Sequence, residues 1–210
     1  MTSYFEVFGL ERKLAIDEAA LQRRFYELSR AHHPDFHQSG PPEAQAHALE
    51  LSALVNAAYR ALRDPIARVE YLIRLEEGRD TKEGDAVKPK APPELLEEMF
   101  EIEEVLHEAR AGGLDDAMRA TLVAQRDRLA ARRAAEEQRI TGELSAAWDG
   151  ATPPDRARIL AAFKDALATR AYLRTVIDDL SEALGDDGLG DDTRASLHGG
   201  GEEHVTHHRH

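Results

Sequence analysis

The sequence contains no cysteine among its 210 residues. This absence excludes a disulfide-bonded scaffold, a thiolate nucleophile, a cysteine zinc site and protein thiolate ligands to an iron–sulfur cluster. The apolar runs are only a few residues long, whereas a membrane-spanning helix needs about 20 apolar residues. The first residues also lack a basic segment followed by an apolar stretch, so we expect no secretory signal and a cytoplasmic location.

Positive charge is scarce. Lys and Arg total 27 against 40 Asp and Glu, which gives a formal net charge of −13. Because phosphate contacts need a basic surface, we expect no general binding to nucleic acid or to an anionic membrane. The charge is uneven, since residues 1–76 hold nine basic and eleven acidic residues and residues 77–210 hold 18 and 29. This shift suggests two modules with different partners.

Proline and glycine divide the chain into segments. Residues 77–92 combine glycine, proline and many charges without apolar periodicity, which is typical of a linker. Residues 185–210 are rich in Gly, Asp and His, and this composition predicts a disordered tail. Four histidines lie in the tail, where a solvated role is a simpler interpretation than a metal site. They are His204, His207, His208 and His210.

The segment before the linker has the apolar spacing of helices. We expect a short helix over residues 4–9 and a second over residues 17–32, with Asp17 as its N-cap. A third helix is expected over residues 43–63, and a proline opens a fourth that ends near residue 76.

Three longer helices are expected after the linker. They cover residues 93–111, 115–148 and 153–184, and glycine follows each of them closely. Strand patterns are absent from the sequence. Long helices joined by short turns indicate an antiparallel three-helix bundle over residues 93–184, in an all-α protein.

The most informative segment joins the second and third helices. His33, Pro34 and Asp35 follow an amphipathic helix that carries several arginines. Arg23 and Arg30 are two helical turns apart, so they share a face that points away from the apolar stripe of the helix. The exposed basic patch leads into a loop with a carboxylate, and such a surface suits an acidic patch on a partner protein.

These features make residues 1–76 similar to the J domain, the module with which co-chaperones activate the ATPase of DnaK/HscA-type heat-shock chaperones. The tripeptide HPD matches the signature loop of the family, and NAAYRALRDP matches the apolar pattern of its third helix. The resemblance implies an antiparallel helical hairpin with short flanking helices. It also implies that the chaperone-binding residues are His33, Pro34, Asp35, Arg23, Arg24 and Arg30.

Two further motifs narrow the resemblance to HscB-type co-chaperones. The opening YFEVFGL is similar to the YFxxFGL of that family, and RVEYL at residues 68–72 is similar to its RAEYL. A short linker followed by an all-helical C-terminal domain also agrees. The chain has neither the Gly/Phe-rich stretch nor the CxxC zinc module of the larger DnaJ proteins. The resemblance covers residues 3–184.

The C-terminal domain of HscB-type co-chaperones binds an IscU-type iron–sulfur scaffold protein and presents it to the chaperone. Its binding patch is apolar and acidic and lies on the first and third helices of the domain. By helical spacing, Leu95 and Met99 fit the core as well as an interface, whereas Leu96 and Phe100 lie on a rotated face. The resemblance implies that the scaffold-binding residues are Leu95, Leu96, Met99, Phe100, Glu103 and Tyr172.

The chain departs from the family at two positions within these sites. Phe36 follows Asp35 where many J domains carry Lys or Arg, and this weakens the positive charge of the loop. Phe100 stands where the family often has Glu, so we expect a more apolar patch here. Tyr172 could also pack inside the bundle instead of contacting a partner.

Other functions stay open on the sequence. A J-domain co-chaperone for a different client would not bind a scaffold protein, and a helical adaptor would not stimulate an ATPase. A metal-handling or enzymatic protein would use histidines such as His32, His33 and His37, but these straddle a proline turn. Because no nucleophile–base arrangement is visible, we expect no catalytic residue, no metal and no cofactor.

Overall fold

The computed structural model describes residues 2–37, 41–78 and 93–185, and among these residues it contains helices and no strand. Most of the expected linker and tail lie outside the described residues. The all-α prediction is confirmed. In chain order the elements are α1 (Tyr4–Val7), α2 (Glu18–Ala31), the 3₁₀ turn η1 (Pro34–His37), α3 (Pro42–Arg63), α4 (Pro65–Glu76), α5 (Pro93–Gly112), α6 (Asp116–Arg139), the π-helical segment η2 (Ile140–Leu144), α7 (Ser145–Asp149) and α8 (Pro153–Leu184).

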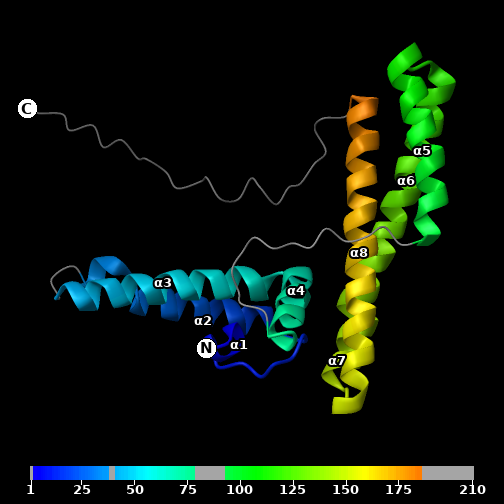
Figure 1. Ribbon diagram of the computed structural model, residues 1–210. Coiled ribbons are helices and arrows are strands. Elements are labelled where there is room, and N and C mark those ends of the chain that lie inside the picture. Colours follow the sequence, from blue (N-terminus) through cyan, green and yellow to red (C-terminus); the bar gives the residue numbers. More distant parts are fainter. Residues whose placement is uncertain (1, 38–40, 79–92, 186–210) are drawn as a thin grey trace, which may run out of the picture.

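An antiparallel hairpin of α2 and α3 dominates the N-terminal half (Figure 1). The Asp17 carboxylate accepts a hydrogen bond from the backbone N–H of Ala20, which fixes the start of α2 by the expected N-cap. The ring of Phe25 on α2 stacks on Tyr59 of α3, with 4.0 Å between ring centroids. Local capping and an apolar stripe therefore suffice to form and pair these two helices.

Contacts between α1 and α4 bring together the two motifs that resemble the HscB family. Tyr71 is 1% exposed, and its ring stacks on that of Tyr4 at 4.3 Å between centroids. The backbone N–H of Tyr4 donates to the Tyr71 hydroxyl at 2.8 Å. The N-terminal aromatic motif and the RVEYL motif thus contact each other through Tyr4 and Tyr71.

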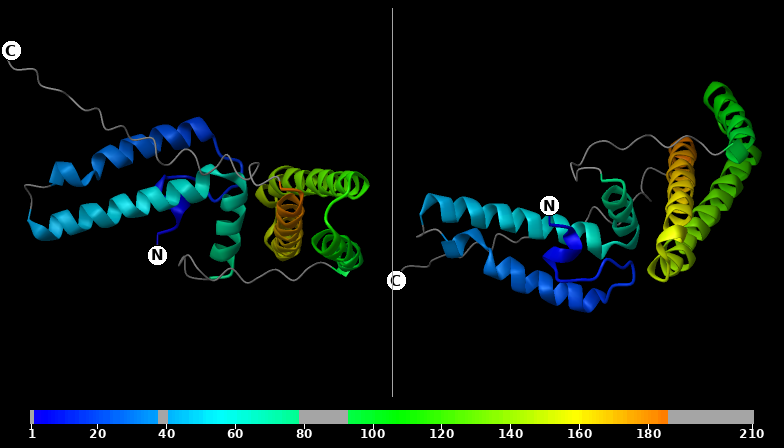
Figure 2. Two further views of the ribbon diagram at one scale, coloured as in Figure 1. Left: turned by 90° about the horizontal axis from the view of Figure 1, so that it is seen from above. Right: turned by 60° about the horizontal axis from the view of Figure 1, so that its bottom comes forward.

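The C-terminal half is a three-helix bundle. Helix α6 runs antiparallel to α8, and α5 lies against the end of this pair that is farther from the N-terminal half (Figures 1 and 2). Leu122 and Leu129 of α6 pack with Leu173 and Leu180 of α8 in one apolar cluster. Helix α8 ends at Gly185, whose φ of 75° is the left-handed conformation that favours glycine.

The helix expected over residues 115–148 is interrupted by the π-helical segment η2. Within it the hydroxyl of Ser145 donates to the carbonyl of Ile140 at 2.7 Å. A π turn inserts a residue and so rotates the residues that follow. Ile140, Leu144 and Trp148 all face one apolar cluster, which also contains residues of α4. Tertiary packing explains this irregularity, and the apolar period of the sequence does not predict it.

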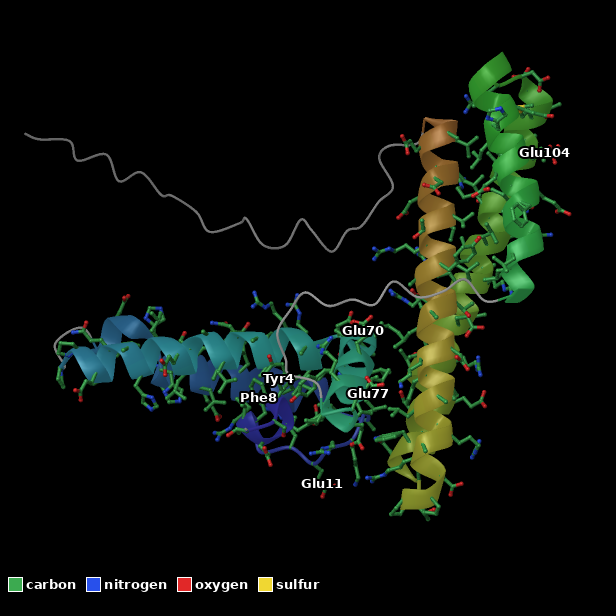
Figure 3. All side chains as sticks on the ribbon, viewed as in Figure 1. Tyr4, Phe8, Glu11, Glu70, Glu77 and Glu104 are labelled. Carbon is green, nitrogen blue, oxygen red and sulfur yellow. The ribbon has the colours of Figure 1, made fainter. Side chains whose placement is uncertain are left out.

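This cluster, the junction core, joins the two halves of the molecule. Val69 and Leu72 of α4 are 1% and 0% exposed and pack with Phe163 of α8. Helix α4 therefore holds the hairpin across the lower part of α8 (Figures 1 and 3). The junction core consists of Leu14, Val69, Leu72, Ile73, Ile140, Leu144, Trp148, Ile159, Phe163 and Ala166.

Polar contacts surround the junction core. The Asp149 carboxylate accepts hydrogen bonds from the backbone N–H groups of Leu14 and Ala15, both at 2.8 Å. Lys164 of α8 forms an ion pair with Glu77 at the end of α4 (Figure 3). A linker by itself does not require such contacts, so they could not be predicted from the sequence. The described residues on either side of the predicted linker therefore pack against each other.

Candidate functional site

The loop after α2 is a tight turn that places a carboxylate on the surface. Helix α2 ends at Ala31 with His32 as its C-cap, and Pro34 begins the 3₁₀ turn η1, where its fixed φ suits the first helical position. The side chain of Asp35 is 69% exposed and that of His33 is 53% exposed. The carboxylate therefore lies where a partner protein can reach it. Of Pro34, only the backbone lies within the described residues.

His33 supports this turn from the side. The backbone N–H of Asp35 donates to Nδ1 of His33 at 3.3 Å, and the imidazole edge contacts the ring of Phe36 at 5.9 Å between centroids. The same nitrogen lies 3.6 Å from a carboxylate oxygen of Asp35. His33 therefore contacts both the backbone and the side chain of Asp35. This is the geometry expected of a positioning residue.

The basic face of α2 adjoins this loop. Arg23, Arg24 and Arg30 are all exposed, and Arg23 and Arg30 form no ion pair with a described residue. Arg24 pairs with Glu27 on the same helix at 2.9 Å, so part of its charge is already compensated. The structure thus favours Arg23 and Arg30 over Arg24 for contact with an acidic partner.

An aromatic residue on the same face was missed in the sequence. Tyr26 is 62% exposed although it is large and partly apolar. It lies three residues after Arg23 and four before Arg30, which puts all three side chains on one face of α2. That spacing is visible in the sequence and could have identified it. The face is therefore basic and aromatic rather than only basic.

The expected client patch on α5 divides into exposed and buried residues. Leu96 is 40% and Phe100 is 66% exposed, and Glu103 is also exposed. Leu95 is 1% exposed and packs in the bundle core, so its side chain is not available to a partner and its assignment to the binding surface was wrong. The side chain of Met99 lies outside the described residues.

Tyr172 belongs to α8, and its side chain lies near Glu98 and Glu103 of α5. Its ring packs against the bundle core, and its hydroxyl is buried without a hydrogen-bond partner among the described residues. Burial raises the pKa of Tyr172, and the nearby carboxylates of Glu103, Glu98 and Asp179 raise it further. The structure therefore brings Tyr172 and Glu103 together, although they are far apart in sequence.

The described residues lack the features of two other kinds of site. Among them, no group of three or more His, Asp or Glu side chains could hold a metal ion. Within the same ranges, no helix combines the length and the apolar character needed to cross a membrane. The loop at Asp35 and the patch at Phe100 lie in different halves of the molecule, and the junction core fixes how they are oriented.

Comparison with known proteins supports the fold. No family model matches the chain. The solved structure of the chaperone HscB from Vibrio cholerae matches with a TM-score of 0.57 and 23% identity, covering 88% of this chain and 98% of that one. The human co-chaperone protein HscB matches with a TM-score of 0.57 and 24% identity, covering 86% and 81%. The fold implied by the sequence motifs is confirmed, and the chain has the all-α architecture of HscB.

Proposed function

We propose that this protein is a co-chaperone that stimulates the ATPase of an HscA/DnaK-type chaperone and delivers an IscU-type scaffold protein to it during iron–sulfur cluster assembly. The observation that carries the proposal is the surface position of Asp35, beside a basic helix face, in a chain with the HscB fold. Its place of action is the cytoplasm. The protein needs no active site or cofactor of its own, because the chemistry belongs to the chaperone.

The docking loop acts by binding one state of the chaperone more tightly than another. A ligand shifts a conformational equilibrium only by its difference in affinity for the two states. Asp35 is suited to make that difference, since its carboxylate is exposed and its backbone is held by Pro34 and His33. The hydrolysis-competent state of the chaperone would present a cation at this position.

The face with Arg23, Tyr26 and Arg30 guides the encounter. Exposed charges steer association and orient the partner, and salt screens them over about 10 Å at 0.1 M. We expect stimulation through this face to weaken as salt is raised. Tyr26 adds an apolar contact that salt does not screen.

The patch on α5 holds the client. Leu96 and Phe100 offer apolar area, and Glu103 adds a negative charge beside it. Because the junction core joins both halves, the client and the chaperone are held in one complex at a defined relative orientation. Such coupling raises the local concentration of one partner near the other.

The test is the steady-state ATPase rate of an HscA/DnaK-type chaperone, measured with this protein, with an IscU-type scaffold, and with both. We expect stimulation by the protein alone and a further, more than additive, stimulation with the scaffold. Asp35→Asn should abolish stimulation and leave the circular dichroism melt unchanged, because the side chain is exposed. Asp116→Asn, which removes an exposed carboxylate from the first turn of α6, is the matched control.

The outcomes separate the candidate functions. Stimulation without synergy would indicate a J-domain co-chaperone for a different client, which the apolar Phe100 in place of an acidic residue makes a reasonable second candidate. No stimulation would leave a helical adaptor. Wild-type stimulation by Asp35→Asn would contradict the assignment of the docking loop.

A further inference from the structure

A carboxylate joins helix α5, which carries the client patch, to helix α6. One carboxylate oxygen of Glu98 accepts a hydrogen bond from Arg128, and the other accepts one from Arg132 at 3.2 Å. The two arginines are four residues apart on α6, so they lie on one face of that helix. These three residues, which we call the Glu98 bridge, thus engage both oxygens of the carboxylate within the protein.

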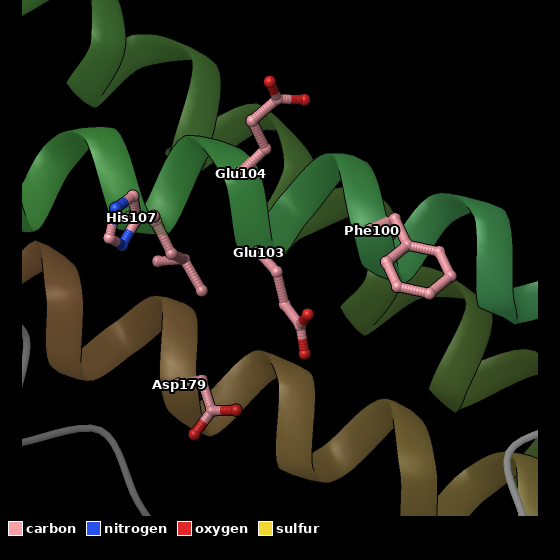
Figure 4. Close-up of a pocket in the computed structure, with 6 residues that line it drawn as sticks. Phe100, Glu103, Glu104, His107 and Asp179 are labelled. Atoms are coloured by element: carbon pink, nitrogen blue, oxygen red, sulfur yellow. The ribbon is translucent and has the colours of Figure 1, made fainter.

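Glu98 differs from the carboxylate that was predicted to bind the client. Its side chain is 18% exposed, and the arginines that bind it come from another helix. Glu103, in contrast, is exposed and forms no ion pair with a described residue. Figure 4 shows Glu103 extending from α5 toward α8, in the same stretch of the helix from which the ring of Phe100 projects. Glu103 is therefore open to a partner, whereas Glu98 is committed to α6.

Glu98 and the apolar anchors of the patch lie on opposite sides of α5. Leu96 is two residues before Glu98 and Phe100 is two residues after it, so each is about 160° around the helix from Glu98. Both anchors are exposed. Leu95 and Ile102 lie on the same side as Glu98 by helical spacing, and both are buried in the bundle core. One side of α5 is thus held by the bundle, and the other side presents the anchors.

The Glu98 bridge adds directional contacts to this attachment. Apolar packing is non-directional, whereas a hydrogen bond weakens steeply as its angle departs from linear, so the bridge resists rotation of α5 about its axis. Side chains on a helix lie about 5–6 Å from its axis, so a rotation of about 20° moves them by about 2 Å. The core of a protein interface is packed as densely as a protein interior, and a shift of this size disrupts such packing.

We propose that the Glu98 bridge fixes the rotation of α5 and so orients Leu96 and Phe100 toward the client scaffold. Glu98 is then a positioning residue, which acts through the two anchors and does not contact the scaffold itself. The inference rests on the proposed function, because the scaffold is the client. It also gives two arginines of α6, a helix outside the predicted binding surface, a part in client binding.

Isothermal titration calorimetry of an IscU-type scaffold against the full chain tests the proposal. We expect Glu98→Gln to raise Kd about twofold to fivefold, as for the loss of a partly exposed ion pair. The melting temperature should change little, because the apolar contacts of α5 are kept. Glu108→Gln is the matched control and should leave Kd unchanged, since Glu108 is exposed on the same helix and forms no ion pair with a described residue.

A charge inversion separates positioning from direct contact with the scaffold. Glu98→Arg places a third guanidinium beside Arg128 and Arg132, so it should raise Kd more than Glu98→Gln does. The triple variant Glu98→Arg, Arg128→Glu, Arg132→Glu restores opposite charges across the same contact and should return Kd to within about twofold of the wild type. A Glu98 that binds the scaffold directly would not be rescued in this way. A folded triple variant without rescue would overturn the proposal.

Hydrogen exchange tests the same point without a partner. Backbone amides of α5 should exchange faster in Glu98→Gln than in the wild type, whereas those of α8 should keep their rates, because the bridge supports α5 locally. Equal acceleration in both helices would show a global loss of stability and would contradict the positioning role.

The results distinguish failure of this inference from failure of the proposed function. If the wild type and Glu98→Gln bind the scaffold with the same Kd, the bridge does not position the anchors and the client role stands. If the wild type does not bind the scaffold at all, the client role is wrong. Hydrogen exchange along α5 then still decides whether the bridge holds this helix.

Discussion

Arg68 is a charged residue that the fold buries. It is 4% exposed, its Nε donates to the carbonyl of Leu62 at 2.7 Å, and a terminal nitrogen donates to that of Leu14 at 2.5 Å. Burial lowers the pKa of Arg68, and the carboxylates of Glu18, Asp64 and Asp149 oppose that shift. This single side chain ties the end of α3 and the loop before α2 to α4. The arginine that opens the RVEYL motif is therefore structural.

Replacing Arg68 should destabilise the protein strongly. Arg68→Met keeps most of the apolar stem but leaves two buried carbonyls without donors, so we expect a loss of about 2–4 kcal/mol in the free energy of unfolding. Urea denaturation followed by circular dichroism measures it. Arg60→Met, at an exposed position on α3, should change stability by less than about 0.5 kcal/mol. Equal effects of the two changes would contradict this account.

Glu6 gives the fold a specific response to acid. Its carboxylate accepts the backbone N–H of Ser3 at 2.6 Å, as part of the capping box of α1. That backbone hydrogen bond, followed by the contact with the Ser3 hydroxyl, lowers the pKa of Glu6 below its ordinary value of 4.5. A group with a lowered pKa in the folded state stabilises the protein above its ordinary pKa. The contribution is lost as the pH falls through the lowered value.

The melting temperature as a function of pH tests this point. Between about pH 5 and pH 3, the melting temperature of Glu6→Gln should fall less steeply than that of the wild type, because Gln does not titrate. Glu43→Gln, at an exposed position in the first turn of α3, is the control and should follow the wild-type slope. If the melting temperatures of Glu6→Gln and the wild type fall in parallel with pH, Glu6 does not contribute to the acid sensitivity of the fold.

Helix α5 is apolar on two faces, and the two faces differ in role. Leu95, Ile102 and Leu106 are buried at 1%, 5% and 6% exposure and belong to the bundle core. Leu96 and Phe100 are turned to solvent on the neighbouring face. An exposed apolar face on a helix that already has a buried face is typical of an interaction surface.

Paired substitutions on α5 test this division. Leu96→Ala with Phe100→Ala should weaken scaffold binding at least about tenfold, as expected for exposed anchors, and should lower the melting temperature little. Leu95→Ala is the core comparison and should cost about 2–5 kcal/mol of stability. Calorimetric binding and thermal melts of both variants measure the two effects. If the double variant does not fold, Leu96 and Phe100 contribute to the core and their assignment to the binding surface is wrong.

The helices were predictable from sequence because their ends are local. Asp17 caps α2 by its own carboxylate, and Gly185 ends α8 by its own backbone conformation. Segment η2 was not predictable, since the local sequence does not show that Ile140 and Leu144 pack with residues of α4 and α8. At the candidate site, the surface position of Asp35 follows from its motif, whereas placing Tyr172 near Glu103 requires the register of α8 against α5.

For the molecule as a whole, the junction core converts two helical units into one body. Trp148 is 2% exposed there, with the guanidinium of Arg156 at 5.3 Å from its ring centroid. Beside it, Asp149 is the acceptor for two backbone N–H groups of the opposite half. The orientation of the docking loop relative to the client patch therefore depends on side chains distant from both.

Loosening this junction should separate stimulation from delivery. Asp149→Ala removes both hydrogen bonds, so we expect ATPase stimulation without scaffold to persist and the additional stimulation by scaffold to fall by at least about half. Small-angle X-ray scattering should show a larger radius of gyration. Asp165→Ala, at an exposed position on α8, is the control. Full synergy in the Asp149 variant, together with unchanged scattering, would show that orientation does not matter.

The three apolar clusters formed by the described residues have no residue in common. One stabilises the hairpin with the docking loop, another stabilises the helices with the client patch, and the junction core lies between them. A change of sequence at either partner surface thus leaves the support of the other untouched. Over evolutionary time, such a protein can change its client while keeping its chaperone, or the reverse, without changes in the apolar cluster that supports the other surface.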